Sequence, residues 1–247
     1  MEQAALPSQF LEVRRVAQQE RAVRTRQAIL AAAAQVFDEV GYEAATVSEI
    51  LTRSGVTKGA LYFHFASKEQ LAQGVLQENA QVVPPVPSQR LKLQEAVDRG
   101  MLLAYQMGVD PLLRGSVRLA LERSGNDSLD RKIPFEAWTR ESETLLEQAR
   151  LAGELQPHVD TKELAGVFVG AFAGVQLMSQ AMTDRQDLCD RIAVLYRVLM
   201  AGAAVPSALV QLDVTADRGA KVQAMVDQLL REEPDPQGDR PSLVGQG

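Results

Sequence analysis

The chain has 247 residues, 46% of them hydrophobic, and carries a formal charge of −6 from 26 lysines and arginines against 32 aspartates and glutamates. Its length allows one large domain or two smaller ones around an ample apolar core. A single cysteine and two histidines exclude a disulfide framework and histidine-rich metal enzymes, and they predict a reducing, cytoplasmic setting with no cofactor. The first residues, MEQAALPSQFLEV, lack the cationic start and apolar stretch of a secretory signal.

The overall acidity argues against a nucleic-acid partner, since duplex binding is dominated by lysines and arginines that displace counterions from phosphates. The charge is unevenly distributed, however. Residues 14–68 hold eight basic and five acidic side chains, and five arginines fall between Arg14 and Arg26, opposed only by Glu20. The N-terminal third therefore carries a locally basic segment, which keeps DNA binding open.

Helical periodicity dominates the chain, and strand alternation is absent over any useful length, so we predict an all-α fold. Residues 20–40 repeat apolar side chains at helical spacing from Ile29 to Val40, and Gly41 is positioned to end that helix. Residues 20–40 are thus expected to form a long amphipathic helix, followed by a short loop.

Two N-capping signatures come next. The sequences TVSE and SKEQ, which begin at Thr46 and Ser67, have the form of capping boxes. The first opens a short helix that ends at Gly55, and Thr57 caps a second short helix. The second opens a helix that runs to Val82, where a proline cluster ends it. We take that cluster as the domain boundary.

Beyond the prolines, apolar spacing predicts six more helices, at about 89–108, 111–123, 133–152, 160–182, 185–203 and 217–232. The most apolar run, from Leu164 to Val175, is shorter than the roughly 20 residues needed to cross a bilayer, which predicts a buried helix and no membrane partner.

We accordingly divide the chain into five parts. These are a flexible N-terminal extension, a head of short helices, a connecting helix, a helical body, and a disordered tail. They cover residues 1–18, 19–66, 67–82, 83–232 and 233–247.

Residues 46–65, TVSEILTRSGVTKGALYFHF, join two short helices through a glycine turn, which is the form of a helix-turn-helix whose second helix enters the major groove. In that second helix Lys58 and Tyr62 share an outward surface, and Thr57 lies at the helix start, where the dipole favours phosphate. Gly59 allows a close backbone approach. The alternative is an ordinary helical hairpin whose exposed lysine and tyrosine bind nothing.

The predicted body has polar and small residues within an apolar helix. Glycines recur every four residues from Gly166 to Gly174, which favours close helix packing or leaves room for a ligand. Gln176 and Ser179 interrupt the apolar pattern, and a buried amide needs a hydrogen-bond partner, which a carbonyl or hydroxyl of a bound ligand could supply. Asn79, close to the predicted domain boundary, is a comparable candidate for a hydrogen bond to a ligand.

The sequence contains no Rossmann glycine loop, P-loop, HExxH motif or nucleophile elbow. We therefore predict no catalytic residue and no metal ligand. The rival from another class is an enzyme or carrier for an apolar small molecule, with the N-terminal head as a docking module.

The block from Arg21 to Ala72, including GVTKGALYFHF and SKEQLA, closely resembles the DNA-binding domain of the tetracycline-repressor family of bacterial regulators. More narrowly, residues 19–222 resemble the γ-butyrolactone autoregulator receptors of streptomycetes, through SVRLALE, AWT and DRGAK. The resemblance implies a three-helix head that reads DNA and a body that binds ligand and dimerises. It implies operator contacts by Thr57, Lys58, Gly59, Tyr62 and Phe63, and phosphate-side contacts by Thr46, His64 and Lys68.

The resemblance also implies that Trp138 lines a lactone pocket, whereas its spacing alone, on a helical stripe with Phe135, is typical of a core. We predict that the apolar chain of the ligand lies among Trp138, Phe135 and Phe172. The predicted function is a homodimeric repressor that a small γ-butyrolactone or butenolide releases from a pseudo-palindromic operator, controlling secondary metabolism. A repressor of the same family that answers to an antibiotic or a biosynthetic intermediate is the alternative.

Overall fold

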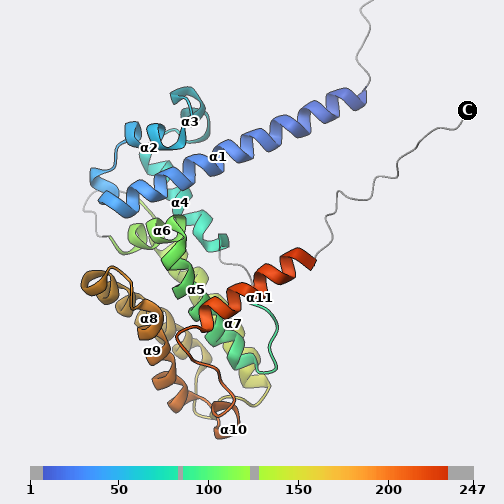
Figure 1. Cartoon of the computed structure of the whole chain (residues 1–247), viewed down its shortest axis with the longest axis vertical. Coiled ribbons are helices and arrows are strands. Elements are labelled where there is room, and N and C mark those ends of the chain that lie inside the picture. Colours follow the sequence, from blue (N-terminus) through green and yellow to red (C-terminus); the bar gives the residue numbers. More distant parts are fainter. Residues whose placement is uncertain (1–7, 83–85, 123–127, 233–247) are drawn as a thin grey trace, which may run out of the picture. The chain divides into compact units, whose positions relative to one another are not determined.

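The computed structural model describes residues 8–82, 86–122 and 128–232, and within these ranges the side chains of residues 8–14 and 79–82 are left undescribed. The regular elements of the described ranges are helices, and the β-structure there consists of an isolated bridge between Leu155 and Ala204. The all-α prediction is confirmed. Figure 1 shows the course of the chain.

Apart from α1, which begins earlier than expected, the helices lie close to the boundaries expected from apolar spacing, and α10 is a short addition. In chain order they are α1 (Ser8–Ala44), α2 (Val47–Ser54), α3 (Lys58–His64), α4 (Lys68–Val82), α5 (Lys92–Val109), α6 (Pro111–Leu121), α7 (Lys132–Leu151), α8 (Thr161–Thr183), α9 (Leu188–Ala203), α10 (Pro206–Leu209) and α11 (Arg218–Glu232).

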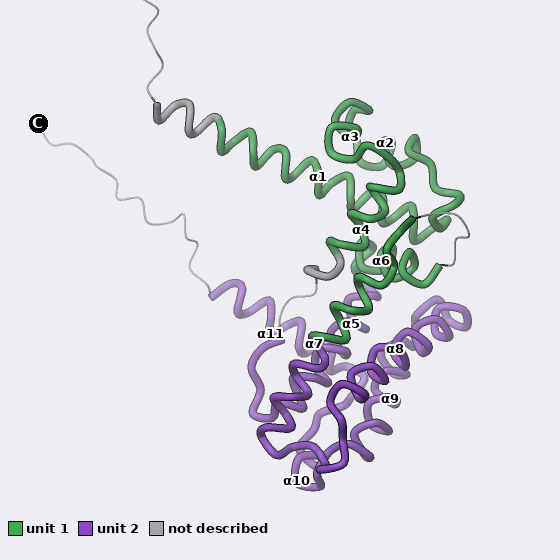
Figure 2. The backbone as a smooth tube through the Cα atoms, turned by 180° about the vertical axis from the view of Figure 1, so that it is seen from behind, with its two compact units in different colours: residues 1–83, 109–140 green, residues 84–108, 141–247 purple. Residues whose placement is uncertain are grey.

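The chain forms two compact units, coloured separately in Figure 2. Unit 1 comprises residues 1–83 and 109–140, and unit 2 comprises residues 84–108 and 141–247. Unit 1 therefore contains α6 and the start of α7 as well as the predicted head. The chain passes from unit 1 to unit 2 between residues 83 and 84, at the proline cluster, but it returns to unit 1 for residues 109–140, so the predicted division into a head and a body stays a prediction.

The first helix, α1, begins at Ser8 instead of near residue 20, so residues 8–18 are helical where a flexible extension was expected. This stretch is rich in glutamine, glutamate and arginine, which favour helix without adding apolar periodicity. Gly41 interrupts the helix as predicted. Its φ of +79° is a left-handed conformation that glycine adopts without strain.

The predicted capping boxes differ in detail. At α2 the box is complete, because the Thr46 hydroxyl accepts the Glu49 N–H and the Glu49 carboxylate accepts the Thr46 N–H. At α4 the Ser67 hydroxyl accepts the Gln70 N–H at 3.1 Å, but the Gln70 side chain accepts the N–H of Ala66. Both helices are thus started by local hydrogen bonds that the sequence encodes.

The core of unit 1 forms where α1 packs against α2, α4 and α6. Ile50 of α2 and Leu61 of α3 are buried in this core, so each short helix is anchored by a large side chain. This anchoring fixes the direction in which α3 presents its outer face. The large, fully buried side chains of unit 1 include Phe37, Ile29, Leu30, Ile50, Leu61, Leu71, Leu76, Leu113 and Leu119.

Unit 2 is built around α5, most of which is buried. Its Asp98, fully buried, accepts two hydrogen bonds of 2.7 Å from the guanidinium of Arg218 in α11. This paired geometry compensates both buried charges. Gly100 lies against the buried ring of Tyr196 in α9, where a larger residue would overlap the phenol.

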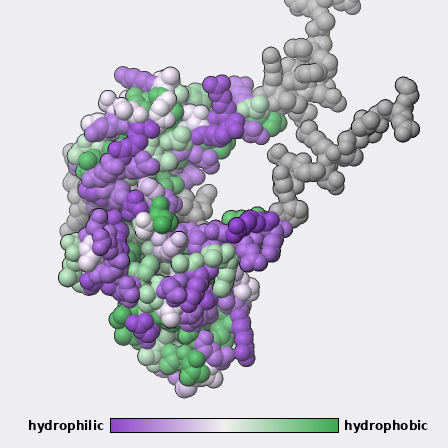
Figure 3. Space-filling view, viewed as in Figure 1, coloured by the Kyte–Doolittle hydropathy of each residue, from purple (hydrophilic) through white to green (hydrophobic). Residues whose placement is uncertain are grey.

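The structure corrects the expectation that α8 is a buried helix. Only 28% of its most apolar stretch is buried, and its length and hydropathy alone are sufficient to cross a membrane, which is weak evidence for a span. The apolar stretch of α8 continues beyond Gln176, so it is longer than the run from Leu164 to Val175 on which the expectation was based. Hydrophobic surface is visible over the part of unit 2 that contains α9 and α10 (Figure 3). The buried face of α8 carries Ala165, Phe168, Phe172, Gln176 and Ser179.

Candidate nucleic-acid interface

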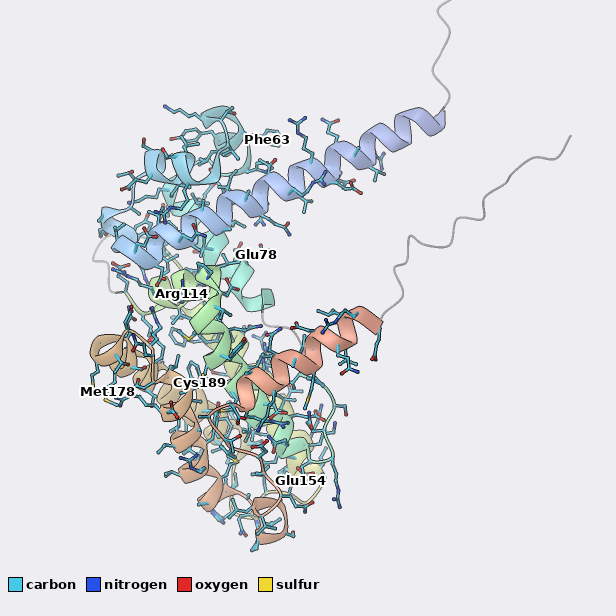
Figure 4. All side chains as sticks on the ribbon, in the orientation of Figure 1. Phe63, Glu78, Arg114, Glu154, Met178 and Cys189 are labelled. Atoms are coloured by element: carbon cyan, nitrogen blue, oxygen red, sulfur yellow. The ribbon has the colours of Figure 1, made fainter. Side chains whose placement is uncertain are left out.

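The outer face of α3 brings together the residues predicted to read DNA. Thr57 caps the helix, with its hydroxyl accepting the Ala60 N–H at 3.2 Å. The Lys58 ammonium lies 5.9 Å from the centroid of the Tyr62 ring, and both side chains are exposed. Phe63 is 81% exposed and points away from the core (Figure 4). A cation, a phenol and an uncovered aromatic ring therefore share one short helical surface.

Gly59 and His64 complete this surface. A Cβ at Gly59 would meet no atom within 4 Å, so packing inside the protein does not require glycine there. The half-buried imidazole of His64 packs edge-to-face on Phe63, with ring centroids 5.1 Å apart. Gly59 leaves α3 open to a close approach from outside, while His64 supports the exposed ring.

Thr46 lies at the exposed start of α2, where a phosphate contact was predicted. Its hydroxyl donates to the Glu49 carboxylate at 2.7 Å, and this hydrogen bond lowers the pKa of Glu49. A phosphate at this position would lie close to that carboxylate. The Thr46 contact stays a prediction.

Lys68 has a clear structural role. Its ammonium donates to the backbone carbonyls of Tyr42, Glu43 and Ala45 at 2.8, 3.3 and 3.0 Å, and it lies 4.5 Å from the centroid of the Tyr42 ring. An ammonium has three donors, and all three are used here. Lys68 therefore caps the end of α1, and its predicted phosphate contact stays a prediction that this geometry does not favour.

Sequence reasoning missed the contacts that tie α6 to the end of α1. Arg114 forms a 2.7 Å ion pair with Asp38, and the Arg118 guanidinium donates to the Asp38 carbonyl. The Glu122 carboxylate accepts the backbone N–H of Tyr42 at 2.8 Å. We call these contacts the α6 clamp. Local sequence patterns do not predict these contacts, because the partners lie 76 to 80 residues apart.

The predicted ligand-binding residues fall in two places. Phe135 and Trp138, in the part of α7 that belongs to unit 1, are half-buried with their rings edge-to-face and 5.8 Å apart. Phe172 and Gln176 lie on the buried face of α8 in unit 2. Gln176 is 1% exposed, and no group in the described part of the chain donates a hydrogen bond to its Oε1 atom. The side chain of Asn79 lies outside the described residues.

Ser179, the remaining predicted ligand contact, already has a partner. Its hydroxyl donates to the Asp187 carboxylate at 2.6 Å, and Thr183 and Arg191 also bind that carboxylate. These contacts, with Ser179 foremost, lower the pKa of Asp187 to about 2. In the described ranges, histidine, cysteine and carboxylate side chains do not gather into a group of three that would hold a metal ion.

Comparisons with known proteins identify the family. Residues 29–75, which include α2 and α3, match the family described as bacterial regulatory proteins, tetR family. The A-factor receptor protein of Streptomyces griseus is 38% identical over 197 residues, which cover 80% of this chain and 70% of the relative. The chain belongs to the TetR family.

Solved structures extend this TetR-family relationship to the helices beyond the head. Full-length native TylP, a TetR regulator from Streptomyces fradiae, matches with a TM-score of 0.78 and 50% identity, covering 83% of this chain and 98% of TylP. A γ-butyrolactone receptor described as ArpA-like matches with a TM-score of 0.62 and 26% identity, covering 83% of this chain and 98% of the receptor. The predicted architecture of a helix-turn-helix head and a helical body is confirmed.

Proposed function

We propose that this TetR-family regulator represses transcription by inserting α3 into the major groove of an operator. The exposed surface of Lys58, Tyr62 and Phe63 is the observation that carries the proposal. Lysine suits phosphate or guanine, and the aromatic side chains suit thymine methyl groups or the sugar backbone. The test is an electrophoretic shift on duplexes that the wild-type protein selects from a random-sequence library. Lys58→Ala should abolish retention, and unchanged retention at physiological salt would refute the role of α3.

The repressor acts, in this proposal, as a homodimer joined through the outer faces of α8 and α9. Met178 and Met182 on α8 are 46% and 66% exposed, and Val194 and Val198 on α9 are 50% and 67% exposed. Apolar side chains exposed on adjacent helices mark an interaction surface. The α8 glycines predicted to allow close packing lie in open space, since a Cβ at Gly166, Gly170 or Gly174 would meet nothing within 4 Å.

Two-fold symmetry follows from such a dimer. Each subunit would present one α3, so the operator would be pseudo-palindromic with half-sites about one helical turn, or a multiple, apart. The likeness to TetR-family regulators supports this arrangement.

We propose that the releasing ligand is a small γ-butyrolactone or butenolide, and that repression of this kind controls secondary metabolism. The likeness to the A-factor receptor and to a γ-butyrolactone receptor supports this choice. In unit 2, the uncompensated Oε1 of Gln176 would accept a hydrogen bond from a ligand hydroxyl, with Phe172 beside it. In unit 1, Trp138 and Phe135 offer aromatic surface to an alkyl chain.

Each ligand contact is tested separately. Trp138→Ala and Gln176→Leu should keep DNA binding but raise the lactone concentration needed for release. Normal release by lactone would remove the altered residue from the site. Release by an antibiotic or biosynthetic intermediate but not by any lactone would reassign the ligand.

Release requires that the ligand bind one conformation more tightly than another, because equal affinity shifts no equilibrium. We propose that, in the conformation that the ligand favours, the distance between the two α3 helices no longer matches the distance between successive major grooves. Within unit 1, α4 and the α6 clamp are the elements that hold α1, and with it α2 and α3, in place.

A further inference from the structure

Exposed arginines lie on the N-terminal half of α1, before residues 29–75, which match the description of the family. Arg15, Arg21 and Arg24 all precede Ile29, the first buried residue of α1 among those whose side chains are described. Within the described ranges none of these three guanidinium groups forms a hydrogen bond or an ion pair. Three cations that have no partner among the described side chains are therefore held on a helix that projects from the core of unit 1.

Arg26, unlike these three arginines, contacts other side chains of unit 1. It pairs with Glu78 of α4 at 2.9 Å, and its guanidinium lies 5.5 Å from the centroid of the Phe65 ring. Arg26 thereby fastens α1 to α4. The arginines upstream of it contribute nothing comparable to the stability of unit 1.

The helical repeat places two of the three on the side of α1 that carries the helix-turn-helix. Arg21 and Glu39 are eighteen residues apart, which is five turns at 3.6 residues per turn, so they lie on the same side. Glu39 pairs with Arg53 of α2 at 2.6 Å, which identifies that side. Arg24 is close to Arg21 on the helix surface, whereas Arg15 is turned about 120° away from Arg21.

Figure 4 agrees with this geometry. Nitrogen-tipped side chains rise from the N-terminal half of α1 toward the side on which α3 and the labelled Phe63 lie. All these elements belong to unit 1. A duplex that receives α3 would therefore pass on the same side as these cations.

We propose that Arg21 and Arg24 form a second DNA-binding surface, which contacts backbone phosphates beside the groove that α3 enters. The inference rests on the proposed function of α3. Guanidinium groups bind phosphate with two parallel hydrogen bonds, and phosphate contacts set position and affinity without reading bases. The surface thus adds affinity for DNA of any sequence and lengthens the contacted site at its edges.

The experiment measures DNA affinity by fluorescence anisotropy over a series of KCl concentrations. One probe is a duplex selected by the wild-type protein from a random-sequence library, and the other is a mixed-sequence duplex of about 40 base pairs. The test variant is Arg21→Ala/Arg24→Ala, in which alanine preserves the helix. The matched control is Arg90→Ala/Lys162→Ala, which removes two exposed cations from unit 2.

The test variant should bind both probes more weakly by a similar factor. The slope of log affinity against log salt should become shallower by about 0.9 for each DNA phosphate that the protein no longer neutralises. The control variant should keep the wild-type slope, and Arg15→Ala should weaken binding less than Arg24→Ala. A wild-type slope in the test variant would overturn the inference, and so would weakening confined to the selected duplex, which would indicate base reading.

The inference and the proposed function fail in different ways. If the wild-type protein selects a duplex and Lys58→Ala does not bind it, while Arg21→Ala/Arg24→Ala binds as wild type, only the second surface is refuted. If the wild-type protein selects no duplex from the library and does not bind the mixed-sequence duplex, the role of α3 and the second surface are refuted together.

Discussion

Gly115 of α6 lies directly against the backbone of Ala34 in α1, and a Cβ at Gly115 would overlap the Ala34 carbonyl. Only glycine allows the two helices to approach this closely. The α6 clamp forms along the same pair of helices, where Arg114 pairs with Asp38. The contact of Gly115 with Ala34 therefore sets the distance at which α6 holds α1.

Gly115→Ala should push α6 away from α1 and lower the free energy of unfolding by about 1–3 kcal/mol, because overpacking forces the backbones apart. Urea denaturation followed by circular dichroism measures this change. Gly108→Ala, in α5, is the matched control, since its Cβ would meet nothing within 4 Å. Equal stability of the two variants would contradict the close packing of α6 on α1.

Lys68→Met should lower the free energy of unfolding by about 1–3 kcal/mol, because three backbone carbonyls would be left without their charged donor. Lys58→Met should leave stability unchanged and weaken DNA binding, since Lys58 is exposed on α3. Denaturation and DNA titration of both variants separate the two roles. Normal stability of Lys68→Met with a shallower salt dependence of DNA binding would instead make Lys68 a phosphate contact.

The pKa of Asp187, lowered from 3.8 to about 2 chiefly by the Ser179 hydroxyl, makes the stability of unit 2 depend on pH. The carboxyl group of Asp187 binds its proton more tightly in the unfolded chain than in the folded chain. The stabilising contribution is therefore fully present above about pH 4 and is lost as the pH falls toward 2.

Asp187→Asn tests this dependence. Its stability deficit relative to wild type should be largest near pH 6 and should shrink as the pH falls from 4 to 2. Asp190→Asn, at an exposed position in the first turn of α9, is the control. A deficit that stays constant over this pH range would show that the Asp187 charge is not stabilised by its neighbours.

Val198→Glu should convert a dimer into a monomer, because the valine is 67% exposed on the proposed apolar interface and a buried carboxylate would lack a partner. Val210→Glu places the same charge at a valine that is 83% exposed near α10, outside the proposed interface. Sedimentation analysis distinguishes the two variants. A Val198→Glu variant that stays dimeric would require a different interface.

The sequence predicted those features that depend on neighbouring residues. The capping box at Thr46, the glycine interruption at Gly41 and the exposed α3 surface all follow from local spacing, and the structure contains each of them. The N-terminal turns of α1 were missed because glutamine, glutamate and arginine, which favour helix, are interspersed with their apolar residues and weaken the apolar pattern there. Periodicity also failed for α8, where an apolar helix proved exposed along one face.

Features that depend on distant partners were beyond prediction. The spacing around Lys68 gives no sign that its ammonium caps α1, because Tyr42 lies 26 residues away. Ser179 and Asp187 are close in sequence, but the apolar spacing of α8 does not show that the turn between α8 and α9 brings their side chains together. Lys68 and Ser179 therefore show that the polarity of a residue in the sequence does not by itself identify a binding site.

The most direct test of the account is footprinting of the wild-type protein on the duplexes it selects, with and without a γ-butyrolactone. We expect protection of a site with approximate two-fold symmetry, and we expect the lactone to abolish that protection. Binding without sequence preference would contradict the account of α3 as a reading helix. Protection that no lactone relieves would contradict the proposed ligand.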